Sequence, residues 1–326
     1  MTAPTRGGSR ARRTVMVLMG VGVSTALLWL AFRDTDFSEI RRHAAEASIA
    51  ILSLVLVTKA AALTAAAVRS VVILRKLHPY TFWQVLKSLL VGYFGNAALP
   101  FRAGEVMRVA YLARESDGNV PPTSAIAVLV VERMMDSLCL LLLLVCVVLS
   151  GVAEVPVGTV VYAVGALIAI GMAVLVWVSR SPERVTSLFA RSTFLSDKVR
   201  RFANGLAALR RGNGLAAVAV ATAAYWGCQA LAISVWVWAF GLSLPWYAPM
   251  VVLVFIAFGA ALPSAPGFIG TYHFFAISAF VLLGADRSAA ASVATVGHFL
   301  AIVPPALLGA AVLAAEFRAR PDRGSG

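Results

Sequence analysis

Long apolar runs restrict the possible fold of this chain more than any other feature. A helix rises about 1.5 Å per residue, so ~20 apolar residues are enough to cross a bilayer core of ~30 Å. Six such runs are present, at 14–32, 48–74, 122–150, 156–178, 214–240 and 289–316. Membrane strands alternate in polarity over about 10 residues, and these runs do not, which disfavours a barrel. The runs therefore predict an all-α polytopic membrane protein.

Two further apolar segments, 82–113 and 247–284, are interrupted by proline and glycine. Each contains Ala-Ala-Leu-Pro followed four residues later by Gly, beginning at Ala97 and again at Ala260, an offset of 163 in 326 residues. A short match of this kind can arise by chance in membrane helices, but an offset of half the length favours internal duplication. Paired broken helices in corresponding halves indicate a substrate site in a transporter-type protein.

Charge predicts the orientation of these segments. Loop 179–213 carries eight basic and two acidic residues, so the positive-inside rule places it in the cytoplasm, together with both basic chain ends. These placements agree if each broken segment enters and leaves the membrane on one face, as a re-entrant hairpin. Two short complete crossings in each segment would satisfy the charges equally well.

The predicted fold thus has about six full spans plus two re-entrant broken-helix hairpins, eight helical membrane segments in all, arranged as an inverted repeat. The predicted parts are a basic cytoplasmic tail at 1–13, a first membrane half at 14–150 with hairpin 82–113, a second half at 151–316 with loop 179–213 and hairpin 247–284, and a basic cytoplasmic tail at 317–326.

Within the basic loop, Val199, Phe202, Leu206 and Leu209 recur at steps of three and four residues between arginines. That spacing predicts an amphipathic helix lying in the cytoplasmic interface, where anchoring is the simplest role.

The first hairpin offers a candidate anion site. Pro100 ends one helix and Gly104 permits a second to begin, with unpaired amides and the positive end of its dipole near Arg102 and Arg108. Such a helix start suits a phosphate, although an ordinary polar surface loop is the alternative. Glu105 can pair with Arg108 on one helix face. The candidate substrate-binding residues are Asn96, Pro100, Arg102, Gly104, Glu105 and Arg108, with Pro263, Pro266, Gly267 and Gly270 in the second hairpin.

A second candidate is the charged group Glu132, Arg133 and Asp136, about 15 Å along the apolar run that begins at 122. Charges at that depth are costly unless they are paired or face a wet cavity, so they indicate function. A purely structural cluster that bonds neighbouring helices is the alternative. Lys59 is a candidate counter-ion, and we expect Arg69 to extend its charge toward the membrane surface.

Other chemistry has little support in the sequence. His273 is a further candidate for the intramembrane charge network of Lys59, Glu132, Arg133 and Asp136. His273 and His298 are nevertheless lone histidines on apolar helices, which more often pack than carry protons. The three cysteines have no metal-ligand or disulfide spacing, and no catalytic, metal-binding or nucleotide-binding pattern is visible. We therefore expect no cofactor, no metal and no enzymatic activity. We also expect no nucleic-acid partner, because the basic residues behind the net charge of +13 cluster between the membrane spans.

Three motifs together resemble a known family, the lysylphosphatidylglycerol synthase transmembrane family of flippase-like membrane proteins. They are Asn96-x-x-Leu99-Pro100-x-Arg102-x-Gly104-Glu105-x-x-Arg108, Glu132-Arg133-x-x-Asp136 and Pro263-x-x-Pro266-Gly267-x-x-Gly270. One departure is His273, where family members often carry Glu. The resemblance implies a membrane unit that flips a lipid made by a fused synthetase. With no such domain among these 326 residues, we expect the transport half without the synthesis half.

These observations lead to the hypothesis of a lipid translocase for an anionic or modified phospholipid, or a polyprenyl-phosphate-type lipid. The expected place is the bacterial inner membrane, with both termini cytoplasmic. Its partners would be membrane phospholipids and, on one alternative, a separately encoded lipid-modifying enzyme that it serves as a non-transporting scaffold. A transporter of a soluble anion is the other alternative.

Overall fold

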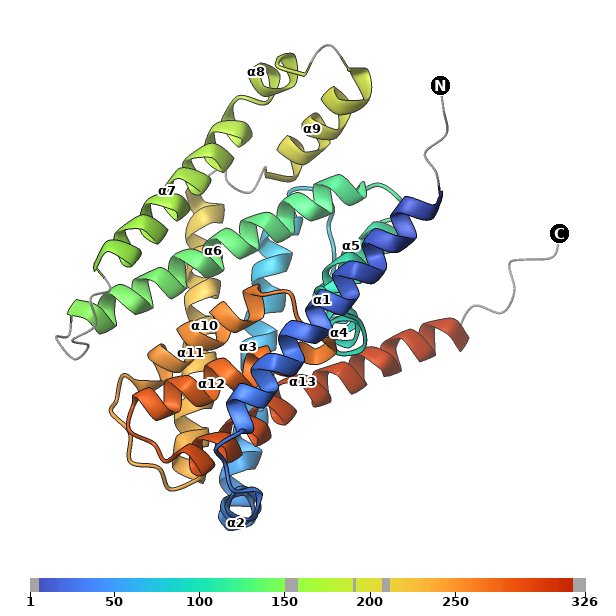
Figure 1. Cartoon of the computed structure of the whole chain (residues 1–326). Helices are drawn as coiled ribbons and strands as arrows, with labels where there is room; N and C mark the ends of the chain where they lie inside the picture. Colours follow the sequence, from blue (N-terminus) through green and yellow to red (C-terminus); the bar gives the residue numbers. More distant parts are fainter. Residues whose placement is uncertain (1–5, 150–157, 190–191, 207–211, 319–326) are drawn as a thin grey trace. The chain divides into compact units, whose positions relative to one another are not determined.

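The computed structural model describes residues 6–149, 158–189, 192–206 and 212–318, and every regular element within these ranges is helical (Figure 1). A long helix occupies each of the six predicted apolar runs. These are α1 (Arg6–Phe32), α3 (Ile49–Leu74), α6 (Pro122–Leu149), α7 (Gly158–Arg180), α10 (Gly212–Ala239) and α13 (Arg287–Arg318). Among the described residues, Ile49–Leu74, Leu215–Ala239 and Arg287–Arg318 are long and apolar enough to cross a membrane. The count of six full spans stays a prediction.

Both predicted broken segments are pairs of helices. The first comprises α4 (Phe82–Ala98) and α5 (Ala103–Glu115), and the second comprises α11 (Ala248–Ala261), the short 3₁₀ turn η2 (Pro266–Phe268) and α12 (Thr271–Leu282). The first helix of each pair ends at the second alanine of the repeated motif, Ala98 or Ala261, just before Leu-Pro. A residue before proline is pushed from the helical to the extended region, and Leu262 has ψ 149°. The sequence repeat is therefore a repeat of helix ends.

The second helices of the two pairs start differently. Helix α5 begins at Ala103, directly after the turn, so Gly104 lies inside it. In the second pair Gly267 has φ 67° and Gly270 has φ 91°, and the helix resumes only at Thr271. Backbone with positive φ suits glycine, which lacks the Cβ that makes this region costly. The second motif thus builds a longer turn than the first.

Glycine also lets the paired helices approach closely. A Cβ added at Gly104 would overlap the carbonyl oxygen of Gly92 and the side chain of Asn96, both on α4. In the second pair, a Cβ added at Gly259 would lie 2.9 Å from the carbonyl oxygen of Thr271. Each pair therefore packs backbone against backbone.

Short helices lie between the first two long helices of each half of the sequence. Helix α2 (Phe37–Glu46) was not predicted from the sequence; Asp36 caps it by accepting the amide of Ser38 at 2.7 Å, and hydrogen bonding from Ser38 lowers the pKa of the Asp36 carboxyl. In the basic loop lie α8 (Pro182–Ser187) and α9 (Thr193–Gly205). Helix α9 confirms a helix over the Val199 and Phe202 positions of the predicted amphipathic pattern, whereas Leu209 lies outside the described residues, as do residues 1–5 and 319–326 of the basic tails.

The order of elements is the same in both halves of the sequence: a long helix, a short helical segment, a long helix, a broken pair and a last long helix. The packing is also reciprocal, because α2 packs on α13 and α9 packs on α6. Each contact includes a serine hydroxyl that donates to a carbonyl oxygen of the short helix at 2.8 Å, from Ser292 to Ile40 and from Ser124 to Arg201. This reciprocity supports the predicted duplication.

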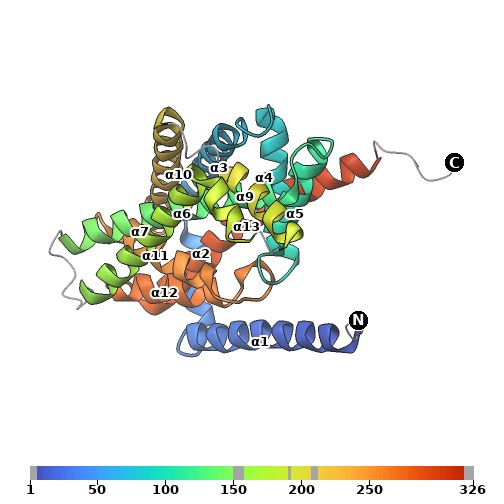
Figure 2. The same ribbon diagram turned by 90° about the horizontal axis from the view of Figure 1, so that it is seen from above.

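The chain forms two compact units, each drawn from both halves of the sequence. Unit 1 contains residues 1–55, 92–104 and 233–326, and within it α12 packs on α1, α11 and α13 (Figures 1 and 2). Unit 2 contains residues 56–91 and 105–232, and within it α6 packs on α7 and α9. An apolar core of unit 2 includes Ile73, Leu74, Val85, Leu112, Val128 and Val131.

We predict that Gly104→Ala lowers the free energy of unfolding by about 1–3 kcal/mol, because the added methyl group must force α4 and α5 apart. The midpoint of thermal unfolding of the detergent-solubilised protein measures this. Gly227→Ala in α10 is the matched control, since nothing lies within 4 Å of its Cβ position. Equal midpoints for the two variants would contradict the close approach of α4 and α5.

Candidate functional site

The predicted charged group lies in unit 2, where it forms a buried network between α3, α5, α6 and α10. At its centre, Arg108 of α5 makes a bidentate pair with Glu132 of α6, with N–O distances of 2.6 and 3.0 Å. Both side chains are almost fully buried, at 4% and 1% exposure. The hydroxyl of Ser70 on α3 donates to Glu132 Oε1 at 2.5 Å and accepts from Arg108 Nη2 at 2.9 Å. Three helices are therefore joined at one carboxylate.

Asp136, one helical turn beyond Glu132, holds a second buried pair. Arg69 Nη1 on α3 donates to Asp136 Oδ1 at 2.5 Å, and the indole Nε1 of Trp226 on α10 donates to the same oxygen at 3.0 Å. Thr222 Oγ1 lies 3.5 Å from Arg69 Nη1. Charge-assisted bonds of this kind compensate for the loss of water around a buried carboxylate.

Arg133 forms the open end of the network. Its Nη2 donates to Glu105 Oε1 of α5 at 2.8 Å, and its Nη1 lies 3.5 Å from Asp136 Oδ2. The side chains of Arg133 and Glu105 are 47% and 24% exposed. A half-exposed guanidinium in the interior of a long, mostly apolar helix is costly in lipid unless it faces water or an anion.

The six ionised side chains are three arginines and three carboxylates, so their formal charges cancel. Neutral balance makes burial tolerable but does not make it favourable, because an apolar cluster of similar volume is often as stable. A buried, neutral network is therefore weak evidence for stability, and its functional role stays a prediction.

The network corrects three expectations about ion pairing. Lys59 was predicted to neutralise Glu132 or Asp136, but its Nζ lies 2.6 Å from Gln229 Oε1. In the described ion pairs, arginines neutralise both carboxylates. Arg69 was expected to reach toward the membrane surface, yet its side chain is 4% exposed. Position along a helix gives depth only, and the packed face decides which cation meets which carboxylate.

The third correction concerns α5. Glu105 was predicted to pair with Arg108 along the helix, but the bidentate partner of Arg108 is Glu132. Glu105 bonds Arg133, also on α6. A contact between helices is preferred here because it neutralises charges that both helices bury. The predicted reach of Arg133 to Asp136 is present at 3.5 Å.

In unit 1 the structure brings Asn96, Pro100, Arg102 and Gly104 into one turn. Asn96 Oδ1 accepts the amide of Gly104 at 2.9 Å, so the first turn of α5 already has one internal acceptor. Phe101 and Arg102 have φ of 58° and 54°, a left-handed conformation that costs about 1–2 kcal/mol per residue. The predicted open helix start is thus partly capped by its own hairpin.

Residues of the second motif also lie at this turn. The guanidinium of Arg102 is 6.0 Å from the ring centre of Phe268. The second turn is held by Ser24 of α1, whose hydroxyl accepts the amide of Ala265 at 2.7 Å. Unit 1 therefore contains the turns of both broken helix pairs.

Aromatic and imidazole rings surround the second turn. His298 Nε2 lies 2.7 Å from the carbonyl oxygen of Gly267, and the His298 ring centre lies 4.7 Å from that of His273 and 4.5 Å from that of Tyr272. The Tyr272 hydroxyl and His273 Nδ1 are buried without a hydrogen-bond partner among the described residues. The prediction that His273 joins the charge network is wrong, because packing on His298 places it beside Gly267 in unit 1, whereas Glu132 and Asp136 belong to unit 2.

Sequence reasoning missed the neutral members of these sites. Ser70, Trp226, Ser24 and Tyr272 carry one polar atom each on otherwise apolar helices, which is common in membrane proteins and gave no signal. No group of three or more His, Cys, Asp or Glu side chains suited to a metal occurs among the described residues.

A comparison with protein families identifies the chain. The family model described as "Lysylphosphatidylglycerol synthase TM region" matches residues 17–309. The chain belongs to this family. No curated protein matches it significantly. Membership indicates a multi-pass membrane protein related to lipid modification or translocation. The matched region includes the whole charge network and both turns.

We predict that Glu132→Gln, which keeps the shape of the side chain, lowers the free energy of unfolding by about 3–5 kcal/mol, because Arg108 stays buried without a counter-charge. Thermal unfolding in detergent measures the loss. The control is Arg42→Gln on α2, which removes an exposed ion pair with Glu39 and should change stability by less than about 1 kcal/mol. Equal effects of the two variants would refute a buried pair.

Proposed function

We propose that this protein is a lipid translocase that moves an anionic or modified phospholipid, or a polyprenyl-phosphate-type lipid, across the bacterial inner membrane. The observation that carries the proposal is the charge network of α3, α5 and α6, with buried pairs at one end and half-exposed Arg133 at the other. Family membership supports the choice of a lipid over a soluble anion. The proposed activity is transport and not catalysis.

Arg133 is the proposed contact for the headgroup. A phosphate offers a guanidinium the same bidentate geometry as a carboxylate, so it can compete with Glu105 for Arg133. Arg108 is a poorer candidate than the sequence indicated, because Glu132 and Ser70 already take its terminal nitrogens. The proposal therefore moves the headgroup site from Arg108 to Arg133.

Helix α5 would transmit headgroup binding. It carries Glu105 and Arg108, both bonded to α6, and it begins in the turn that holds Asn96 and Arg102. Release of Glu105 by a phosphate would break one of the two ion pairs described between α5 and α6. Movement of a broken helix about such a contact is the kind of step that alternating access requires, while acyl chains stay in lipid.

We predict that Arg133→Ala reduces lipid translocation at least about tenfold, because the headgroup loses a charge-assisted contact. The assay follows dithionite quenching of fluorescent anionic, zwitterionic and aminoacylated phospholipids in liposomes that contain the purified protein. Arg42→Ala, which removes an exposed arginine from α2, should keep the wild-type rate. Wild-type rates equal to those of protein-free liposomes for all three headgroups would contradict a translocase, and would favour a scaffold for a lipid-modifying enzyme.

A double variant separates transport from folding. We predict that Arg108→Met with Glu132→Met restores most of the stability lost in Glu132→Gln, because no unpaired charge stays buried. The same protein should translocate lipid at least about tenfold more slowly, since α5 and α6 lose the buried ion pair that joins them and keep only the pair of Glu105 with Arg133. Unfolding midpoints and quenching rates are measured on one preparation. A stable double variant with the wild-type rate would show that the pair is only structural.

A further inference from the structure

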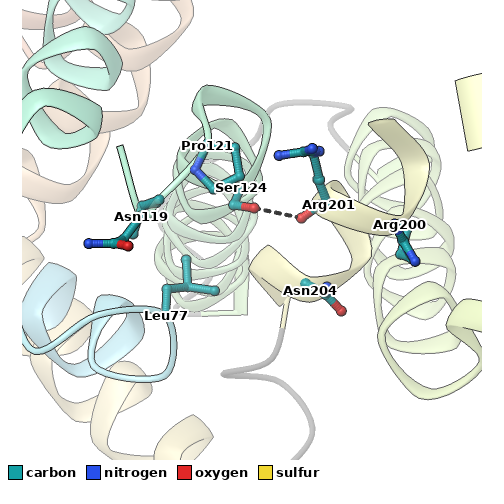
Figure 3. A pocket seen from close by; sticks show the side chains of 8 residues that line it. Leu77, Asn119, Pro121, Ser124, Arg200, Arg201 and Asn204 are labelled. Atoms are coloured by element: carbon teal, nitrogen blue, oxygen red, sulfur yellow. Dashed lines mark hydrogen bonds between the residues drawn. The ribbon is translucent and has the colours of Figure 1, made fainter. Parts of the chain in front are cut away.

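A cavity of about 310 Å³ lies within unit 2, where the start of α6 meets α9 (Figure 3). It is lined by Leu77, Asn119, Val120, Pro121, Ser124, Arg200, Arg201 and Asn204. None of these lining residues is acidic, and two are arginines. The proposed headgroup contact Arg133 is not among them.

The polar lining suits an anion. Arg200 pairs with Asp197 at 2.9 Å, whereas Arg201 makes no ion pair within the described part of the chain. In Figure 3 the Arg201 side chain extends toward Pro121 and Ser124 at the start of α6. Pro121 and Ser124 at the start of α6 line the same cavity, so the positive end of the α6 dipole lies on its side. A phosphate-sized anion would meet positive charge from both helices.

The walls of this cavity are held in place. Ser124 Oγ donates to the carbonyl oxygen of Arg201 at 2.8 Å. One turn of α9 beyond, a Cβ added at Gly205 would lie 2.5 Å from Ala127 Cβ and 2.6 Å from the Ser124 carbonyl oxygen, so α9 packs tightly on α6. Arg201 is therefore presented by a backbone that is fixed, and only its side chain needs to order on binding.

The first turns of α9 indicate where the ligand comes from. Phe194 and Leu195 are exposed at 68% and 41%, and Lys198 Nζ lies 4.2 Å from the Phe194 ring centre. Exposed aromatic and aliphatic side chains beside basic ones are typical of a helix in the headgroup layer of a membrane. A ligand that reaches the cavity from this layer is a lipid with its acyl chains in the bilayer.

We propose that this cavity binds the phosphate of an anionic phospholipid headgroup at the membrane surface, with Arg201 as its main contact. This proposal requires only that the protein lies in a membrane, and it does not require that the protein translocates lipid. The α6 helix connects the two sites, because Glu132 follows Ser124 by eight residues, about 12 Å along the helix. A lipid held here would thus lie near the cytoplasmic end of the helix that carries the charge network.

The test is native mass spectrometry of the full-length detergent-solubilised protein with phosphatidylglycerol, phosphatidylcholine and inorganic phosphate. We predict that phosphatidylglycerol binds wild-type protein more tightly than phosphatidylcholine, and that Arg201→Ala weakens phosphatidylglycerol binding about tenfold. Arg201→Lys should weaken it less, since the charge remains. The matched control is Arg184→Ala on α8, which removes one exposed positive charge from the same loop outside the cavity.

Three outcomes would overturn the proposal. Equal losses in Arg201→Ala and Arg184→Ala would show diffuse attraction and no site. Equal binding of both phospholipids would remove the anionic preference, and inorganic phosphate that displaces phosphatidylglycerol at equal concentration would assign the cavity to a free anion. Arg201→Ala should weaken phosphatidylglycerol binding whether or not the wild-type protein translocates lipid in the quenching assay, so a failed translocase hypothesis leaves this test readable.

Discussion

The bidentate pair between Arg108 and Glu132 is the interaction on which the rest of the charge network depends. It joins α5, the second helix of a broken pair, to α6, and Ser70 extends the contact to α3. Because both charges are buried in apolar surroundings, neither can be left alone without a large loss of stability. The pair thereby fixes which faces of three helices meet. Arg133 and Asp136 then fall where Glu105 and Arg69 can reach them.

The broken helices depend on a different constraint, the limits that proline and glycine place on the backbone. Proline ends α4 and α11 at the same place in the repeat, and glycine lets each second helix pack against the first. The freed backbone groups need partners, because water is scarce inside a membrane protein. Asn96 supplies one for α5, and Ser24 and His298 supply others for the second turn. Polar side chains in these apolar helices are thus explained by the breaks they stabilise.

The two halves of the chain pack on one another reciprocally. The last long helix of each half packs on the short helix of the other, with a serine-to-carbonyl bond at each contact. In unit 2 that contact also shapes the cavity beside Arg201, and the same α6 helix carries the charge network farther along. A membrane-surface site and a buried network on one helix fit a protein that handles lipid headgroups.

Helix positions and breaks could be predicted from the sequence, because apolar length and the backbone limits of proline and glycine are local properties. Glu132, Arg133 and Asp136 stood out for the same reason, as charges in an apolar run. Their partners could not be predicted: Lys59 and Arg69 both lie on α3, and only the rotation of that helix in the packed unit gives Asp136 to Arg69. Pairing across helices depends on which faces meet, and that is a property of the tertiary structure alone.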